Sequence, residues 1–183
     1  MNYKIHCCLL GLLLQTAAFS QDKFMFHSIN TVGLSEGSSG MYGIFQSVNG
    51  AGYKKWFGGI GIGADYYHYT SYPLFVDVRY ADQLNKAFAY LDLGYHFMGN
   101  NHPDSDLYYG SFSVSGGFYD DAGIGYRLNS NHKTTFIFTA GYSYKKVKLH
   151  LNSSRCDPGA CTINYSDYIY GYGKVVLKAG VDF

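Results

Sequence analysis

A glycine-rich stretch carries the most familiar chemical signature in this sequence. In WFGGIGIGADYYHY, Gly59, Gly61 and Ala64 have the G-x-G-x-x-A spacing of a turn that cradles the phosphates of a dinucleotide. Such a turn needs a helix that begins at the third small residue. Here the chain continues with strand-forming residues over 65–69 and soon reaches Pro73. The stretch therefore predicts a strand, and we expect neither a nucleotide nor any other cofactor.

A histidine and a carboxylate are the next candidates for chemistry. Asp92 and His96 are four residues apart in AYLDLGYHF, so an extended chain places them on the same face. Such a pair can transfer protons when a reacting group lies beside it. The sequence places no nucleophile there, and we expect an ion-pair and hydrogen-bond network that satisfies buried charges, with no catalytic residue and no metal.

Serine, histidine and acidic residues also gather near two predicted loops. They are the parts of an acyl-transfer site, in which the histidine activates the serine hydroxyl and the acid orients the histidine. The residues are His68, Ser71 and Tyr72 near one loop, and His150, Ser153 and Asp167 near the other. No motif ties them together, so a lipid hydrolase or acyltransferase is an alternative to the main expectation.

The elements that must position these residues are strands, because alternation with period two recurs along the chain. In PLFVDVRY, Leu74, Val76 and Val78 share one face, while Asp77 and Arg79 share the other. About eight such segments are expected, at 24–34, 41–54, 56–69, 73–81, 87–98, 116–128, 134–150 and 166–183. Short turns would lie on one side and two long loops, 99–115 and 152–165, on the other. This is the pattern of an up-and-down outer-membrane barrel.

The less apolar face distinguishes a membrane barrel from a soluble one. A soluble barrel would bury Leu and Ile and expose Lys, Glu, Thr and Asn. Here the minority face holds glycine, acids and bases among aromatics, which suits a narrow lumen, while the other face suits lipid. We expect a lumen network of Asp65, Asp77, Arg79, Asp92, His96, Asp121, Arg127, Lys174, Lys178 and Asp182. The fold class is therefore all-β, an eight-stranded antiparallel transmembrane barrel, with a soluble lipocalin-like ligand-binding barrel as the alternative.

The last residue is aromatic, and Phe183 follows Val181, Ala179 and Leu177 at every second position. With this ending, and with the stretches WFGGIGIGADYYHY, YPLFVDVRY, AYLDLGYHF and DDAGIGYRL, nearly all of the mature chain resembles the small eight-stranded bacterial outer-membrane β-barrel proteins related to OmpX and the OmpA membrane domain. The resemblance implies contact with outer-membrane lipid and recognition of Phe183 by the barrel-assembly machinery. It implies no particular activity.

The start of the chain has the pattern of a secretory signal peptide. Lys4 precedes an apolar core over 5–14, and Ala18-Phe19-Ser20 forms a cleavage site. We expect residues 1–20 to be the signal peptide and residues 21–183 to form the barrel domain, exported to the bacterial outer membrane.

The four cysteines fall into two pairs. Cys7 and Cys8 lie within the predicted signal peptide, whereas Cys156 and Cys161 flank an Asp-Pro-Gly turn in RCDPGAC. In an exported protein we expect Cys156 and Cys161 to form a disulfide, with free thiols as the alternative.

Composition narrows the function classes. The net charge of +1 gives no reason to expect a nucleic-acid partner. Aromatic residues and 23 glycines, with charged residues at 15%, favour strands. The main expectation is a non-enzymatic envelope protein whose surface loops serve structural, adhesion or interaction roles with an extracellular or envelope partner. An outer-membrane enzyme of the lipid A deacylase or acyltransferase type is the alternative from another class.

Overall fold

The protein is an all-β chain in the computed structural model, which describes residues 24–81, 86–99, 110–129, 134–157 and 160–183. The predicted signal peptide, residues 1–20, lies outside this part. Within the described residues, no helix is long and apolar enough to cross a membrane.

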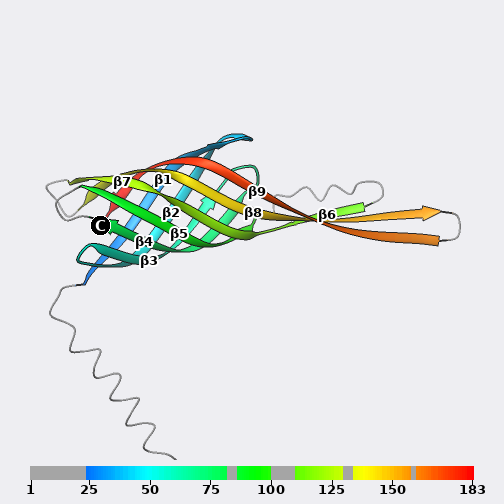
Figure 1. Ribbon diagram of the computed structural model, residues 1–183, viewed down its shortest axis with the longest axis horizontal. Helices are drawn as coiled ribbons and strands as arrows, with labels where there is room; N and C mark the ends of the chain where they lie inside the picture. The colour runs from blue at the N-terminus through cyan, green and yellow to red at the C-terminus, as the bar shows by residue number, and fades with distance from the viewer. Residues whose placement is uncertain (1–23, 82–85, 100–109, 130–133, 158–159) are drawn as a thin grey trace, which may run out of the picture.

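The strands form one closed antiparallel sheet with a single strand attached outside it (Figure 1). They are β1 (Met25–Gly37), β2 (Gly40–Tyr53), β3 (Trp56–Asp65), β4 (Ser71–Ala81), β5 (Ala87–Met98), β6 (Gly110–Ser115), β7 (Gly117–Asn129), β8 (Thr135–Asp157) and β9 (Ala160–Asp182). All strands except β6 follow one another around the barrel, and β1 pairs with β9 to close it. The prediction of an eight-stranded antiparallel barrel is confirmed.

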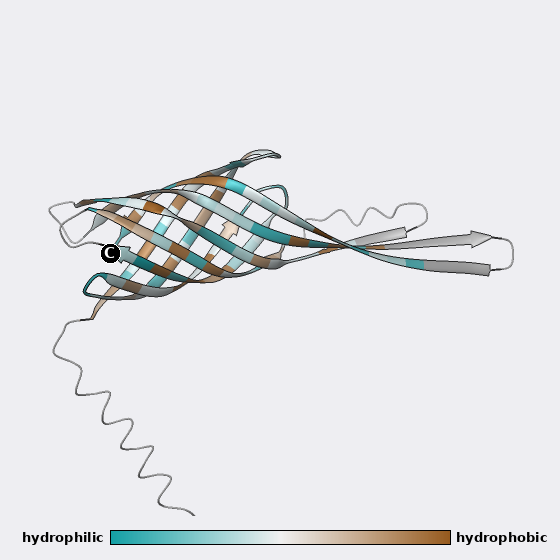
Figure 2. Cartoon of the chain, in the orientation of Figure 1, coloured by the Kyte–Doolittle hydropathy of each residue, from teal (hydrophilic) through white to brown (hydrophobic). Residues whose placement is uncertain are grey.

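The barrel is apolar outside and polar inside. β4 shows this pattern most regularly, because Leu74, Val76 and Val78 are exposed while Asp77 and Arg79 are buried. The same alternation appears as changing hydropathy along the strands of the barrel wall (Figure 2). Exposed aliphatic and aromatic side chains around a charged interior are the polarity of a membrane barrel and the reverse of a soluble one.

The glycines at alternate positions of β3 form a thin part of this wall. Ile60 and Ile62 are 65% and 60% exposed, whereas Gly61 is buried. A Cβ atom added to Gly61 would overlap the ring of Phe75 on the neighbouring strand. The glycine therefore leaves room for an aromatic side chain inside a narrow lumen.

Two predicted loops contain strand where none was expected. The predicted loop 99–115 includes β6, and the predicted loop 152–165 is largely the ends of β8 and β9. The last pair between β1 and β9 is Gly37–Lys174, but β8 and β9 stay paired as far as Asp157–Ala160. β6, residues 146–157 of β8 and residues 160–173 of β9 thus form a projection, the β extension, beyond one end of the barrel (Figure 1). Cross-strand pairing overrides the turn-forming composition of these segments.

The predicted strand 56–69 is also too long, because β3 ends at Asp65 and the segment 66–70 turns back toward β4. At the opposite end of the barrel, the backbones of Ser28 and Phe183 exchange hydrogen bonds of 3.1 and 3.2 Å. The start of β1 and the end of β9 therefore lie together at what we call the terminal end, and the β extension marks the mouth.

Candidate functional site in the barrel interior

Two lysines share one carboxylate near the mouth. The Nζ atom of Lys145 lies 3.2 Å from Oδ2 of Asp65, and Lys174 donates a hydrogen bond to the same oxygen. All three side chains are fully buried. We call Asp65, Lys145 and Lys174 the mouth cluster. β3, β8 and β9 position it, because each of the three residues points inward from its strand.

Lys145 also holds the segment between β3 and β4 over the interior. Its Nζ atom donates to the carbonyl oxygens of Tyr67 and Tyr69 at 2.7 and 3.0 Å, and to the hydroxyl of Ser71 at 3.2 Å. The N–H group of Tyr69 bonds back to the carbonyl of Tyr67, and His68 between them has a φ of 59°. This is a γ-turn with a positive central φ, a strained form that persists because neighbouring contacts fix it.

Aromatic rings complete this covering segment, residues 66–70, which we call the lid. The ring of Tyr172 lies 4.8 Å from that of His68 and 6.3 Å from that of Tyr67, centroid to centroid. The backbone N–H of Ser39 donates to the Tyr67 hydroxyl at 3.1 Å. Burial, with a smaller effect of the Lys145 ammonium, lowers the pKa of His68 below its ordinary value. The lid is thus packed on β9, on the β1–β2 turn and on Lys145.

Three carboxylates lie side by side deeper in the barrel. Asp77 on β4 pairs in register with Asp92 on β5, which pairs in register with Asp121 on β7. Like charges directly opposite one another in a sheet are destabilising. Arg79 compensates Asp77 with three contacts of 2.7 to 3.0 Å, and Lys178 lies 2.8 Å from Asp121. These five residues form the central cluster.

Neutral side chains bind Asp121 and Lys178 of the central cluster. The Tyr90 hydroxyl donates to Asp121 at 2.8 Å. Gln46 accepts a hydrogen bond from Lys178 and donates one to the Tyr119 hydroxyl, both at 2.8 Å. Aromatic rings also fill the lumen, and the ring centroids of Phe75 and Tyr119 lie 5.7 Å apart. The centre of the lumen is therefore occupied by side chains.

The terminal end holds a third group of charges. Nδ1 of His27 lies 2.8 Å from Asp182, and the Arg127 guanidinium lies 5.0 Å from the centroid of the Phe88 ring. Arg79 approaches the same ring at 5.5 Å. Cation–π contacts of this kind stabilise cations that are partly removed from water.

The structure places each residue of the predicted lumen network inside the barrel. Asp65, Asp77, Arg79, Asp92, His96, Asp121, Lys174, Lys178 and Asp182 are buried, and Arg127 is half-buried. Asp92 and His96 are not brought together as a proton-transfer pair: His96 bonds the carbonyl of Lys146 at 2.6 Å, and Asp92 faces Lys178 at 4.0 Å. Lys145 is the main addition. Its strand period places it inside, but the two lid carbonyls that it binds besides Asp65 and Ser71 cannot be read from a sequence pattern.

Some buried polar atoms in the described part of the chain have no hydrogen-bond partner. They are Oδ1 of Asp92, Nδ1 of His96, Nε of Arg127 and Oγ1 of Thr139. In the same part of the chain, no group of three or more His, Cys, Asp or Glu residues is arranged to hold a metal ion. The interior is a network that fills space and balances charge.

The two predicted sets of loop residues that could form an acyl-transfer site are arranged differently in the structure. Ser71 binds Lys145, the His68 ring lies beside that of Tyr172, and Tyr72 points outward and is 50% exposed, so the residues of the first set are not brought together. In the second set, His150 and Asp167 are 2.7 Å apart. Their third neighbour is Ser115 on β6, 3.2 Å from His150, while the side chain of Ser153 lies outside the described part.

The predicted cysteine pair lies near the tip of the β extension. The register of β8 and β9 sets Cys156 opposite Cys161, but their side chains lie outside the described part. Phe183 is 59% exposed on the barrel wall. The disulfide and the assembly signal stay predictions.

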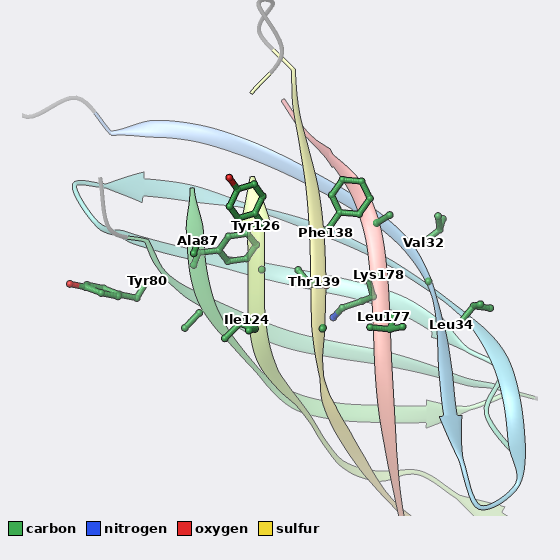
Figure 3. A pocket seen from close by; sticks show the side chains of 16 residues that line it. Val32, Leu34, Tyr80, Ala87, Ile124, Tyr126, Phe138, Thr139, Leu177 and Lys178 are labelled. Carbon is green, nitrogen blue, oxygen red and sulfur yellow. The ribbon is translucent and has the colours of Figure 1, made fainter. Parts of the chain in front are cut away.

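An apolar hollow lies on the barrel wall (Figure 3). Exposed Val32, Leu34, Ile124, Tyr126 and Leu177 lie around it, with alanines between them. Because these side chains belong to the apolar outer face, the hollow is part of the surface that contacts lipid.

Comparisons with known proteins find a likeness among solved structures. No protein-family model matches the sequence, and no curated protein matches it. Among solved structures, the solid-state NMR structure of the outer membrane protein AlkL in DMPC lipid bilayers aligns over 88% of this chain and 90% of that chain, with 10% identity and a TM-score of 0.48. The assignment of the fold rests on the closed sheet and its inverted polarity: the described chain is a small membrane-spanning β-barrel.

Proposed function

We propose that the protein is an outer-membrane barrel with a closed interior, and that it anchors the β extension on the outer side of the membrane as a structural or interaction element. The observation that carries this proposal is the unbroken pairing of β8 with β9, from Thr135–Asp182 in the barrel to Asp157–Ala160 at the tip. At about 3.3 Å per residue, residues 160–173 of β9 reach roughly 45 Å beyond the last pair with β1.

The packed interior supports an anchor and argues against a channel. Eight strands leave room inside for little more than side chains. Here Tyr67, Tyr119 and Lys145 have no exposed surface, and the lid lies across the mouth. We expect the reconstituted protein to give no ion conductance above that of the lipid alone.

The β extension offers a surface for a partner. Tyr165, Tyr168, Ile169 and Tyr170 are between 45% and 74% exposed. Exposed tyrosines bury a large area at little entropic cost, and they are common in protein interfaces. A macromolecular partner at the cell surface is therefore the kind of ligand that suits this region.

Two predictions from the sequence support this role. The opposed positions of Cys156 and Cys161 suit a disulfide that stiffens the tip, since opposed residues in antiparallel strands have Cα separations in the disulfide range. Phe183 at the end of β9 suits recognition by the assembly machinery during insertion.

Epitope insertion tests the proposal. A tag between β8 and β9 should be accessible to antibody on intact cells, whereas a matched tag between β7 and β8 should become accessible only after the outer membrane is opened. The unboiled protein in detergent should also migrate differently from the boiled protein on a gel. Reversed accessibility of the tags, or identical migration together with solubility without detergent, would overturn the proposal.

A further inference from the structure

The β extension brings a serine, a histidine and an aspartate onto one face. In register, His150 on β8 lies opposite Asp167 on β9 and opposite Ser113 on β6. Ser115 lies two residues after Ser113, so it has the same facing. Three separate strands therefore supply Ser115, His150 and Asp167 to one site.

The hydrogen bonds define the order of the three groups. Nδ1 of His150 lies 2.7 Å from Oδ1 of Asp167, and Nε2 lies 3.2 Å from Oγ of Ser115. An ionised carboxylate only accepts, so Nδ1 carries the proton and a neutral ring leaves Nε2 as an acceptor. The Ser115 hydroxyl then donates to Nε2, which is the connectivity of a Ser-His-Asp triad.

A break in the strand pairing follows the serine directly. Ser115 pairs with Lys148 and Tyr119 pairs with Lys145, so residues 116–118 oppose 146–147 and one extra residue is accommodated. Bulges of this kind re-aim side chains and are frequent beside active sites. The side chains of His150 and Asp167 are 39% and 70% exposed, so a substrate can reach the site.

We propose that Ser115, His150 and Asp167 hydrolyse an acyl ester, which extends the proposed function from anchoring to catalysis and rests on its placement of the β extension outside the cell. Oγ of Ser115 forms a bond to the ester carbonyl carbon as its proton passes to His150 Nε2. The C–O bond to the alcohol then breaks, and the alcohol takes that proton. Water attacks the acyl-Ser115 ester, again with His150 as base, and the carboxylic acid leaves as Ser115 regains its proton.

The surroundings favour an ester with an anionic head and an apolar chain. Tyr165 and Ile169 lie on either side of Asp167 on the same face and are 74% and 66% exposed. Lys146 and Lys148 precede His150 on that face, and both are exposed. Apolar side chains can contact an acyl chain, and the two ammonium groups attract phosphate or carboxylate. Membrane lipids and free acyl esters share this chemistry.

Labelling of the full-length protein in detergent with a fluorophosphonate tests the nucleophile. Ser115 Oγ displaces fluoride from phosphorus, and mass spectrometry locates the modified residue without any substitution. We expect the label on Ser115, its loss in Ser115→Ala, and its retention in Ser113→Ala, the matched serine on the same face. An unlabelled wild type, or a label on any other residue, would overturn the proposal.

Hydrolysis assays identify the source of the ester and the role of the acid. p-Nitrophenyl butyrate represents a free ester, and phosphatidylglycerol vesicles represent a lipid. In at least one arm, His150→Gln should lower the rate about 10²- to 10⁴-fold. Asp167→Asn should lower kcat with little change in KM, with recovery in Asp167→Glu. Turnover in neither arm, or equal turnover by Ser115→Ala, would contradict the proposal.

The gel migration of the unboiled protein distinguishes failure of the catalytic proposal from failure of the anchor proposal. A variant that keeps the shift and the accessible β8–β9 tag, but neither reacts nor hydrolyses, leaves the anchor intact and refutes the catalytic site. Loss of the shift or of tag accessibility in the wild type refutes the anchor itself.

Discussion

The mouth cluster and the central cluster balance their charges in opposite ways. The mouth cluster has two ammonium groups for one carboxylate, Asp65, whereas the central cluster has three carboxylates for Arg79 and Lys178. Backbone carbonyls of the lid supply the missing acceptors to Lys145. In the central cluster, the Tyr90 hydroxyl supplies a donor to Asp121.

This difference shows which buried charges the stability of the barrel depends on most. Asp65 is the common partner of two buried cations, and no second carboxylate of the described chain is paired with them in the structure. Asp92, by contrast, has one oxygen without a partner and its nearest cation 4.0 Å away. Removing the first charge should be costly and removing the second should be tolerated, although both side chains are almost completely buried.

The largest effect is expected from Asp65→Asn. Breaking a buried ion pair by removing one partner costs about 3–5 kcal/mol, because the other charge is left uncompensated. Here two lysines lose their carboxylate, and the lid loses support through Lys145. Denaturant titration of the barrel in detergent should show the loss in unfolding free energy. A loss under about 1 kcal/mol would mean that the mouth cluster contributes no more than a surface pair.

A smaller loss is expected from Gly61→Ala, which acts through packing beside the central cluster. The new methyl group would meet the Phe75 ring, and Phe75 packs against Tyr119. Overpacking of a filled interior costs about 1–3 kcal/mol. Gly58→Ala on the same strand is the control, since nothing lies within 4 Å of the added atom. Equal thermal stability of the two variants would show that the lumen at Phe75 is not tightly filled.

Asp92→Asn should change stability little or increase it slightly. The substitution removes a charge that faces Asp77 and Asp121 in register, while its amide can still contact neighbouring groups. The expected change is within about 1 kcal/mol. Measured beside Asp65→Asn under the same conditions, a loss as large as that of Asp65→Asn would erase the contrast between the clusters.

The smallest effect is expected from a change in pH, which alters the stability of the lid. Burial and Lys145 lower the pKa of His68, so the packed lid favours the neutral ring. The stabilisation is complete above the unperturbed histidine pKa of about 6.5, and it is lost as pH falls through the lower value in the packed state. The protection factors of amides 66–70 in hydrogen exchange, which correct for the slower intrinsic exchange in acid, should therefore decrease as the pH falls. His68→Gln should reduce this dependence, and an unchanged profile in that variant would assign the effect to other groups.

The wall of the barrel was predictable because its signal is local. Alternation along PLFVDVRY and AYLDLGYHF separates exposed Leu74 and Leu91 from buried Asp77 and Asp92 without any knowledge of partners. Glycines such as Gly61 follow the same period. The inward and outward faces of a strand can be read from its sequence because lipid outside and the polar lumen inside favour different side chains.

The mouth and the β extension were not predictable for a different reason. Lys145 depends on the carbonyls of Tyr67 and Tyr69, which are far away in sequence and independent of side-chain type. Ser115 meets His150 because β6 pairs with β8, a neighbour that an up-and-down order does not give. Proximity to the predicted loop therefore pointed to Ser153, whereas strand pairing selects Ser115.

Continuity of β8 and β9 makes the β extension a lever. The same two strands that project from the barrel carry Lys145 and Lys174 inside it, and both lysines form ion pairs with Asp65. A sideways force on the tip is transmitted along the two paired strands to the mouth of the barrel. Strain applied at the tip would thus act first on the lid and on the ion pairs beneath it.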